Sequence, residues 1–278
     1  MNVSCRMYNL ECEERKTTDV PYIKHWVHMS TVFLTKRIEF AAAHRYIKPE
    51  WDEARNRAVF GLCYNPPAHG HNYMIEVTVL GEVDPKTGMV VNLFDLKQIL
   101  LTVLEEFDHK NLNLDMPYFE GLIPTSENIA RVLWAKLDKQ KSIGTLHAIR
   151  LYEDEDLYAD VTAEAGLDAA GITRRYSFTA VQDGRPGPEW DCFVTVHGTI
   201  DPVTGMVTDI GALNQLVQEK VLQPFDRQDL RQVLGTQTVT GEQLVEQIWT
   251  QLVTSLSSGR LSNVRLVQSR DLSFEYAG

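Results

Sequence analysis

Hydrophobic and polar positions in the first half of the chain change their period several times along the sequence. Residues 31–43 and 73–81 hold bulky apolar side chains at short intervals and predict two strands. The turn signal at 84–88, followed by the apolar stretch 89–93, predicts a hairpin that ends in a third strand. Residues 94–107 carry apolar side chains at i, i+3, i+4 and i+7, so they predict an amphipathic helix.

A second helix and one more strand complete this half. Thr125 is the expected N-cap of a helix over 126–139, and residues 146–152 predict a strand. Residues 45–62, between the first two strands, are charged and irregular and predict a loop. The order of three strands, two helices and a strand indicates an α+β fold, in which an antiparallel sheet carries both helices on one face.

The second half of the chain repeats the first. The segment GEVDPKTGMV at 81–90 is echoed by GTIDPVTGMV at 198–207. Further matches are Leu104–Asp108 with Leu222–Asp226, Glu127 and Trp134 with Glu242 and Trp249, and Arg150-Leu151 with Arg265-Leu266. Because the matches keep their order and nearly their spacing, they indicate duplication of a whole domain.

The repeat divides the chain into four segments. They are an extension at 1–28, a first domain at 29–162, a linker at 163–173 and a second domain at 174–278. The extension is polar and aperiodic, and we expect it to be disordered or loosely attached. Because Met29 stands directly before the first strand, one hypothesis is that the native protein starts there.

Composition narrows the classes of partner and compartment. The formal net charge of −11 argues against a nucleic acid or an anionic membrane as partner. No apolar run approaches the length of a membrane span. The four cysteines, at positions 5, 12, 63 and 192, form no Cys-x-x-Cys pair, which is typical of reduced thiols, so we expect a cytoplasmic protein.

Three histidines beside the first two strands are candidate metal ligands. His69 and His71 lie two residues apart at the start of the second strand, which puts them on one face, roughly 6.5–7 Å apart. His44 ends the first strand. Imidazole suits zinc, and three protein ligands leave a position for water or substrate. Purely structural histidines would not explain why the repeat lacks all three; the counterparts are Gln182, Pro186 and Pro188.

Two further features could act beside this metal. Cys63 lies just before the histidine pair, and a nearby cation would lower its pKa and favour the reactive thiolate. Asp108 and His109 follow the first helix and could relay protons. The alternative for this pair is a polar helix end, at which the helix dipole favours histidine.

Glu153, at the end of the last strand of this half, is either a functional carboxylate or one surface acid among acidic neighbours. In the repeat it becomes Gln268, and His109 becomes Arg227, while Cys63 has no counterpart. We therefore interpret the second half as a scaffold without zinc or chemistry.

Five groups of residues, taken in order, match motifs of one protein family. They are Phe40-Ala41-Ala42-Ala43-His44-Arg45, Cys63 followed by His69-Gly70-His71-Asn72-Tyr73, Asp84-Pro85 with Thr87-Gly88-Met89, Asp108-His109-Lys110-Asn111-Leu112 and Thr125-Ser126-Glu127-Asn128. The set closely resembles 6-pyruvoyl-tetrahydropterin synthase and its relative, bacterial 6-carboxy-tetrahydropterin synthase. The resemblance covers about 31–161 strongly and 174–276 as a degenerate copy.

The resemblance implies a tunnelling fold (T-fold), in which four-stranded antiparallel sheets from three domains close into a barrel with the helices outside. It implies one Zn²⁺ per chain, in the first half, held by His44, His69 and His71. Cys63 would abstract a proton, and Asp108 and His109 would form the relay. Glu153 would anchor the 2-amino and N3 protons of the pterin, and the adjacent substrate-binding residues would be Thr125, Ser126 and Glu127.

The implied reaction is a lyase reaction on 7,8-dihydroneopterin triphosphate. Zinc would hold the side-chain hydroxyls, triphosphate would leave through carbon–oxygen cleavage, and the product would be 6-pyruvoyl-tetrahydropterin. The five residues between Cys63 and His69 favour this branch. The alternatives are the carboxy-forming branch, a carbon–carbon lyase of deazapurine or queuosine pathways, and a catalytically inactive pterin-binding protein.

The duplication also suggests an assembly. In this family the site lies between neighbouring domains of a ring, and a ring of three cannot alternate two kinds of domain. We therefore expect a homotrimer of six domains, with one ring of first domains stacked on one ring of second domains.

Overall fold

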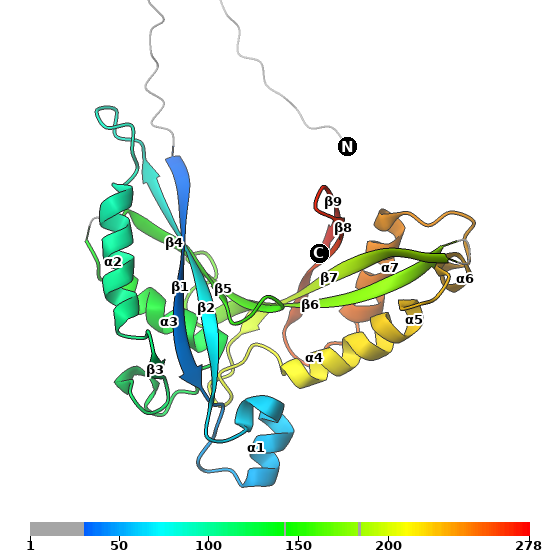
Figure 1. Cartoon of the computed structure of the whole chain (residues 1–278), viewed down its shortest axis with the longest axis horizontal. Coiled ribbons are helices and arrows are strands. Elements are labelled where there is room, and N and C mark those ends of the chain that lie inside the picture. Colours follow the sequence, from blue (N-terminus) through cyan, green and yellow to red (C-terminus); the bar gives the residue numbers. More distant parts are fainter. Residues whose placement is uncertain (1–30, 142, 183–184) are drawn as a thin grey trace, which may run out of the picture.

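The computed structural model describes residues 31–141, 143–182 and 185–278. The predicted extension at 1–28 and the possible start at Met29 lie outside these residues. One long twisted sheet runs through both halves of the chain, with helices beside each half (Figure 1). None of the described helices is long and apolar enough to cross a membrane.

The elements alternate in a similar order in the two halves. Those of the first half are β1 (Thr31–His44), α1 (Glu53–Phe60), η1 (Gly61–Tyr64), β2 (His69–Glu82), α2 (Leu93–Glu105), β3 (Lys110–Asn111), η2 (Pro117–Phe119), α3 (Ser126–Leu137), β4 (Thr145–Tyr152) and β5 (Leu157–Thr162). Those of the second half are β6 (Ala169–Gln182), β7 (Arg185–Thr199), α4 (Ile210–Val217), the π-helical turn η3 (Gln218–Leu222), α5 (Gln223–Phe225), α6 (Leu230–Leu234), α7 (Gly241–Val253), β8 (Arg260–Ser269) and β9 (Leu272–Ala277).

Each half supplies four antiparallel strands and helices on one face, so the predicted α+β arrangement is confirmed. In the first half the strands are β1, β2, β4 and β5, and α2 and α3 pack on them (Figure 1). The four residues at alternate positions from Tyr73 to Val79 are buried, as expected for the core-facing side of a strand. Thr125 caps α3 as predicted, because its Oγ1 accepts a hydrogen bond from Asn128 N at 3.2 Å.

The predicted third strand at 89–93 is wrong. Residues 89–92 form no strand and include a bend at 90–91, and α2 begins at Leu93. The side chain of Asn92 accepts a hydrogen bond from Phe94 N at 2.9 Å, so it caps the helix in place of extending a strand.

The predicted loop at 45–62 is also wrong in part, because it contains α1. This helix starts after Asp52, whose side chain accepts a hydrogen bond from Arg55 N at 2.8 Å. In both places a single polar side chain caps the start of a helix, which the spacing of apolar residues does not predict.

The first half ends in two strands, whereas one was predicted. β4 matches the predicted strand, and β5 follows it after a turn closed by Glu153 N, which donates to Leu157 O at 2.9 Å. β6 then begins at Ala169, within the expected linker at 163–173. Only residues 163–168 therefore separate the two halves of the sheet.

β5 and β6 pair antiparallel, so the two halves lie side by side in one sheet. The prediction that first and second domains occupy separate stacked rings is therefore wrong. The physical reason is the short connection, which returns the chain directly along the edge of β5 and satisfies its backbone groups.

Two matching turns fix how the halves correspond. Asp108 accepts a hydrogen bond from Ala41 N at 2.8 Å, and Asp226 accepts one from Thr179 N at 2.9 Å. The next residues, His109 and Arg227, both have a positive φ, of 57° and 56°. Aligning these turns pairs β1 with β6 and puts position 182 at the counterpart of His44, as the repeat predicts.

The turn at 201–207 of the second half packs on the start of α3 in the first half. Thr125 Oγ1 donates to Gly205 O at 2.7 Å, and Val207 N donates to Glu127 Oε1 at 3.0 Å. Gly205 has a φ of 76°, and a Cβ atom there would collide with the side-chain nitrogen of Asn128. This turn therefore requires glycine both for its backbone and for its close approach.

We expect Gly205→Ala to lower the free energy of unfolding by about 2–5 kcal/mol, because left-handed strain adds to overpacking. Gly121→Ala is the matched control, since its φ is 74° and nothing lies within 4 Å of an added Cβ. The control should cost only about 1–2 kcal/mol. Urea unfolding of both variants measures the difference, and equal losses would contradict the packing of this turn.

Candidate metal centre and active site

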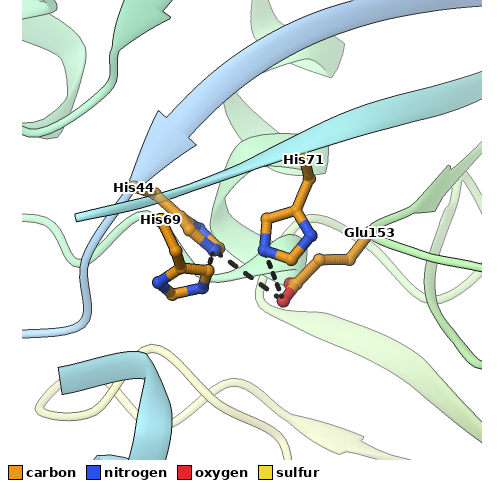
Figure 2. A group of neighbouring side chains, drawn as sticks. All are labelled: His44, His69, His71 and Glu153. Carbon is orange, nitrogen blue, oxygen red and sulfur yellow. Dashed lines mark hydrogen bonds and ion pairs between the residues drawn. The ribbon is translucent and has the colours of Figure 1, made fainter. Parts of the chain in front are cut away.

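Four side chains from three strand ends converge in the first half. His44, at the end of β1, pairs across the sheet with His69, the first residue of β2. His71 follows on β2, and Glu153 comes directly after β4. Their ligand atoms all lie within 4.8 Å of one another (Figure 2). The structure thus brings together the three histidines that the sequence singled out and adds the carboxylate.

His44 is held in its neutral form. Its ring is fully buried, and Nδ1 lies 2.8 Å from Pro124 O. Because a carbonyl oxygen only accepts, Nδ1 carries the proton, which leaves the lone pair of Nε2 free. Burial lowers the pKa of His44 to about 4, so the ring stays neutral near pH 7.

The spacing of the nitrogens fits a metal ion. His44 Nε2 lies 3.0 Å from His69 Nε2, and two nitrogens on a tetrahedral zinc lie about 3.3 Å apart, given the usual bond lengths. His71 Nε2 is buried and has no hydrogen-bond partner among the described residues. A buried ring nitrogen without a hydrogen bond is costly, so this atom fits a role as a metal ligand.

The two carboxylate oxygens of Glu153 have different neighbours: one faces the histidines, and the other accepts hydrogen bonds from nearby hydroxyl groups. Oε1 lies 3.5 Å from His71 Nε2 and 3.8 Å from His44 Nε2. Oε2 accepts from Ser126 Oγ at 2.5 Å and from Tyr46 OH at 3.3 Å. Burial raises the pKa of Tyr46 well above its ordinary value, so its hydroxyl remains a donor. Glu153 is therefore oriented toward the three histidines and is not a surface acid.

Cys63 lies in η1, half-buried against a small cluster that includes Tyr46 and Phe60. Its carbonyl oxygen accepts from Tyr46 N at 2.8 Å, which fixes the segment beside the end of β1. Burial and the charge of Glu153 raise the pKa of Cys63 to about 12. In the protein without a bound cation this thiol is therefore protonated and unreactive at neutral pH.

Asp108 and His109 form a pair at the edge of β1. His109 Nδ1 lies 2.9 Å from Asp108 Oδ2, and the histidine side chain is 81% exposed. A hydrogen bond from Ala41 N and the contact with His109 hold the pKa of Asp108 below its usual value. His109 also lines an open recess of about 1210 Å³ together with His71 and Glu153. His109 of this pair therefore faces the same recess as His71 and Glu153.

The second half reaches this site, which the sequence reasoning did not anticipate. Thr125 and Glu127 are buried and hydrogen-bonded to the turn at 201–207, and Met206 packs into the cluster beside Cys63. The charge of Arg174 on β6 acts on Cys63 and favours its thiolate. The second half is therefore more than a distant scaffold, because it contributes to the walls of the site. In the sequence, only the repeated turn motif at 198–207 could have pointed to this contact of the second half with the site.

The strand ends of the second half that correspond to this site carry different side chains. Among the described residues, the group around His44 is the one cluster of metal-ligating side chains with converging atoms. The second half instead holds a pocket of about 410 Å³, lined among others by Pro188, Trp190 and Gln268. Proline and amide side chains replace the imidazoles and the carboxylate, so this pocket offers no comparable ligand set.

Residues 33–164 and 186–278 match the family model described as 6-pyruvoyl tetrahydropterin synthase. The 6-pyruvoyl tetrahydrobiopterin synthase of Homo sapiens is 43% identical over 124 residues, which are 44% of this chain and 86% of that protein. A putative 6-carboxy-5,6,7,8-tetrahydropterin synthase of Archaeoglobus fulgidus is 39% identical over 93 residues, which are 34% of this chain and 74% of that protein. The solved 6-pyruvoyl tetrahydropterin synthase of Caenorhabditis elegans is 35% identical with a TM-score of 0.46, covering 49% of this chain and 97% of that chain.

Glu127 should make the metal-free protein less stable as the pH rises. Burial raises its pKa from 4.5 to about 7, so the folded protein keeps a proton that the unfolded chain releases between these values. Stability is therefore lost as the pH rises through this window, by up to about 3 kcal/mol. Glu127→Gln keeps an acceptor for Val207 N and should lose this dependence.

Urea unfolding after chelation, at pH 5 and at pH 8, measures the effect. The variant should be more stable than the parent at pH 8 and similar to it at pH 5. Glu120→Gln, at an exposed glutamate, serves as the control and should follow the parent at both values. The same pH dependence in the parent and in Glu127→Gln would show that ionisation of Glu127 does not destabilise the folded protein.

Proposed function

Because this chain belongs to the 6-pyruvoyl tetrahydropterin synthase family, we propose that it is a zinc-dependent lyase that converts 7,8-dihydroneopterin triphosphate to 6-pyruvoyl-tetrahydropterin and triphosphate. The observation that carries the proposal is the convergence of His44, His69 and His71 beside Cys63, with the buried Nε2 of His71 lacking a hydrogen bond to any residue that the structure describes. We propose residues 29–162 as the catalytic domain and the second half, which begins with β6 at Ala169, as the degenerate one. The cytoplasm is the compartment we expect.

His44, His69 and His71 would hold one Zn²⁺ per chain. The neutral state of His44 and the 3.0 Å spacing of two ring nitrogens support this set. When bound, zinc would polarise the side-chain hydroxyls of the substrate and acidify the neighbouring C–H bonds. A divalent cation at this point would also offset the burial and negative charge that keep Cys63 protonated.

Cys63 would then act as the base, taking a proton from the activated carbon of the substrate side chain. The electron pair left on that carbon forms a double bond as the carbon–oxygen bond to triphosphate breaks, and triphosphate leaves with the bonding pair. Asp108 and His109 would relay protons while the side chain tautomerises to the diketone, since His109 lines the same recess as Glu153 and its Nδ1 lies 2.9 Å from Asp108 Oδ2.

Glu153 would anchor the pterin ring through two parallel hydrogen bonds from its 2-amino and N3 groups. Ser126 and Tyr46 support this role, because their hydrogen bonds to Oε2 fix the side chain of Glu153, which lines the open recess. A role in substrate binding for Thr125 and Glu127 remains a prediction. Within one chain their polar atoms already bond to the turn at 201–207.

The carboxy-forming reaction is the second candidate, favoured by the similarity to the Archaeoglobus fulgidus protein. It would cleave a carbon–carbon bond and serve a deazapurine or queuosine pathway, whereas the first candidate serves tetrahydrobiopterin synthesis. Five residues separate Cys63 from His69, which favours the pyruvoyl branch. A pterin-binding protein without turnover is the third reading.

The chain would work as a homo-oligomer, and a homotrimer of six domains is the stoichiometry suggested by the family resemblance. The paired β5 and β6 strands mean that any such assembly must place both kinds of domain in the same sheet. We expect neither nucleic acid nor membrane among its partners.

Metal analysis tests the proposed ligands directly. After equilibrium dialysis we expect about one zinc ion per chain, and His69→Ala should weaken zinc binding by about 100-fold or more, beyond the usual effect of outer-shell changes. His197→Ala, on β7 of the second half, is the control and should bind zinc normally. Two ions per chain, or unchanged binding by His69→Ala, would contradict the site.

Product analysis tests the reaction. Mass spectrometry of products from 7,8-dihydroneopterin triphosphate should detect 6-pyruvoyl-tetrahydropterin, and Cys63→Ala should lower turnover by about 10²–10⁴-fold while zinc stays bound. Cys192→Ala, at the buried cysteine of the second half, should keep its turnover. A 6-carboxy product would select the second candidate, and substrate binding without product would select the third.

A further inference from the structure

The pocket of about 410 Å³ in the second half lies where the strands of that half end. Its walls come from the ends of β6, β7 and β8 and from the segments that lead into α6 and α7 (Figure 1). A pocket of this volume is large enough for a small organic molecule. It shares no lining residue with the recess beside the three histidines, so it is a separate site.

The pocket continues the buried face of the sheet. Along β7 the buried positions run through Cys192 to Trp190, which lines the pocket. In the first half the matching row runs through Ile75 and Tyr73 to His71, one of the candidate metal ligands. The same row of side chains therefore leads to imidazoles in one half and to this pocket in the other.

Trp190 and Gln268 lie beside each other in the wall of the pocket. β7 and β8 pair antiparallel up to Asp191 with Val267, and the next residues along this register are Trp190 and Gln268. Residues opposite each other on antiparallel strands carry their side chains on the same face. Both residues line the pocket, so a bound molecule can reach the two side chains together.

The indole of Trp190 holds a donor that no described residue pairs with. Trp190 is 6% exposed, and its Nε1 is buried without a hydrogen bond to any residue that the structure describes. An indole nitrogen only donates, and a buried donor without an acceptor is costly. Phe274 packs against the indole, with the ring centroids 6.1 Å apart. This N–H therefore fits a role as donor to an acceptor atom of a bound molecule.

Gln268 stands at the position of Glu153 but is held differently. Glu153 Oε2 accepts from Ser126 Oγ, whereas the counterpart of Ser126 is Gly241, which has no side chain. A Cβ atom at Gly241 would collide with the ring of Phe274. The Gln268 side chain makes no hydrogen bond within the described part of the chain. Its amide therefore offers a donor and an acceptor side by side, where a carboxylate offers two acceptors.

The polar groups that line the pocket carry no net charge. Arg231 Nη2 lies 3.1 Å from Asp229 Oδ2, so the two charges in the wall offset each other. The other polar lining residues bear amides or hydroxyls, and the rest of the wall is mostly apolar. Burial of a charged group without a counter-charge is costly, so this lining favours a neutral molecule. The indole favours a flat ring.

We propose that this pocket binds a small, neutral, flat heterocycle with a cyclic amide edge, in which a ring N–H and a carbonyl stand side by side. The ring N–H donates to the amide oxygen of Gln268, and the ring carbonyl accepts from the amide nitrogen. Trp190 Nε1 donates to the second lone pair of that carbonyl. This edge differs from the pair of donors that we propose for Glu153, and it needs no metal ion.

Calorimetry with two matched probes tests the proposal on the zinc-loaded full chain. Isoquinolin-1(2H)-one is a neutral bicycle with one such edge, and 2-methylisoquinolin-1-one lacks only the N–H donor. We expect the first probe to bind once per chain. The second should bind about tenfold more weakly or worse, because it leaves the Gln268 oxygen unpaired.

Chelation of zinc should leave the affinity of the first probe unchanged, since no lining residue belongs to the metal centre. Equal affinity of the two probes, or no binding of the first at millimolar concentration, would overturn the proposal. An affinity that falls on chelation would place the probe in the first half and would also overturn it.

Two substitutions locate the bound probe. Gln268→Glu keeps the shape but sets a carboxylate oxygen against the ring carbonyl, and Trp190→Phe keeps an aromatic ring without the N–H. Each should weaken binding by about tenfold. Gln98→Glu, on α2, and Trp249→Phe, on α7, are the matched controls and should bind as the parent does.

Circular dichroism and zinc content confirm that each variant is folded. Unchanged affinity in either folded pocket variant would overturn the proposal. The comparison of the two probes uses the unaltered chain, so it decides the matter even where a variant fails to fold.

Discussion

The antiparallel pairing of β1 with β2 is the constraint on which the candidate site depends. It sets His44 opposite His69 at the ends of the two strands, and the period of two then puts His71 on the same face. If β2 slipped by one residue against β1, the side chains of β2 would turn to the other face of the sheet. The register is fixed by apolar side chains of β2, buried beneath the helices, so the geometry of the site rests on packing away from the site itself.

Because of the duplication, the second half of the chain always packs beside the candidate site of the first half. The second half has lost the histidines, yet it has kept the turn at 201–207, and that turn completes the surroundings of α3 and Cys63. A covalent link keeps this neighbour at high local concentration, so the contact does not depend on protein concentration. Although it lacks the three histidines, the second half still supplies packing, two hydrogen bonds and the nearby charge of Arg174.

Much of the fold and of the site followed from local signals. The strands at 31–43 and 73–81, the helix capped by Thr125 and the duplication were predicted correctly because each depends on a period or a motif within a short stretch. The failures came where a single polar side chain outweighed the apolar pattern: Asn92 starts a helix at an expected strand, and Asp52 starts one inside an expected loop. The acidic composition after Glu153 also concealed β5.

By itself, the sequence determined which residues are the candidates for chemistry and which half holds them, because His44, His69, His71 and Cys63 are present in one half and absent from the other. Only the tertiary structure decided that Glu153 faces the imidazoles and that the two halves share one sheet. Both outcomes depend on contacts between residues far apart along the chain. Hydrophobic period and local propensity describe neighbours in sequence, so they carry no information about which strand edges and side chains meet in space.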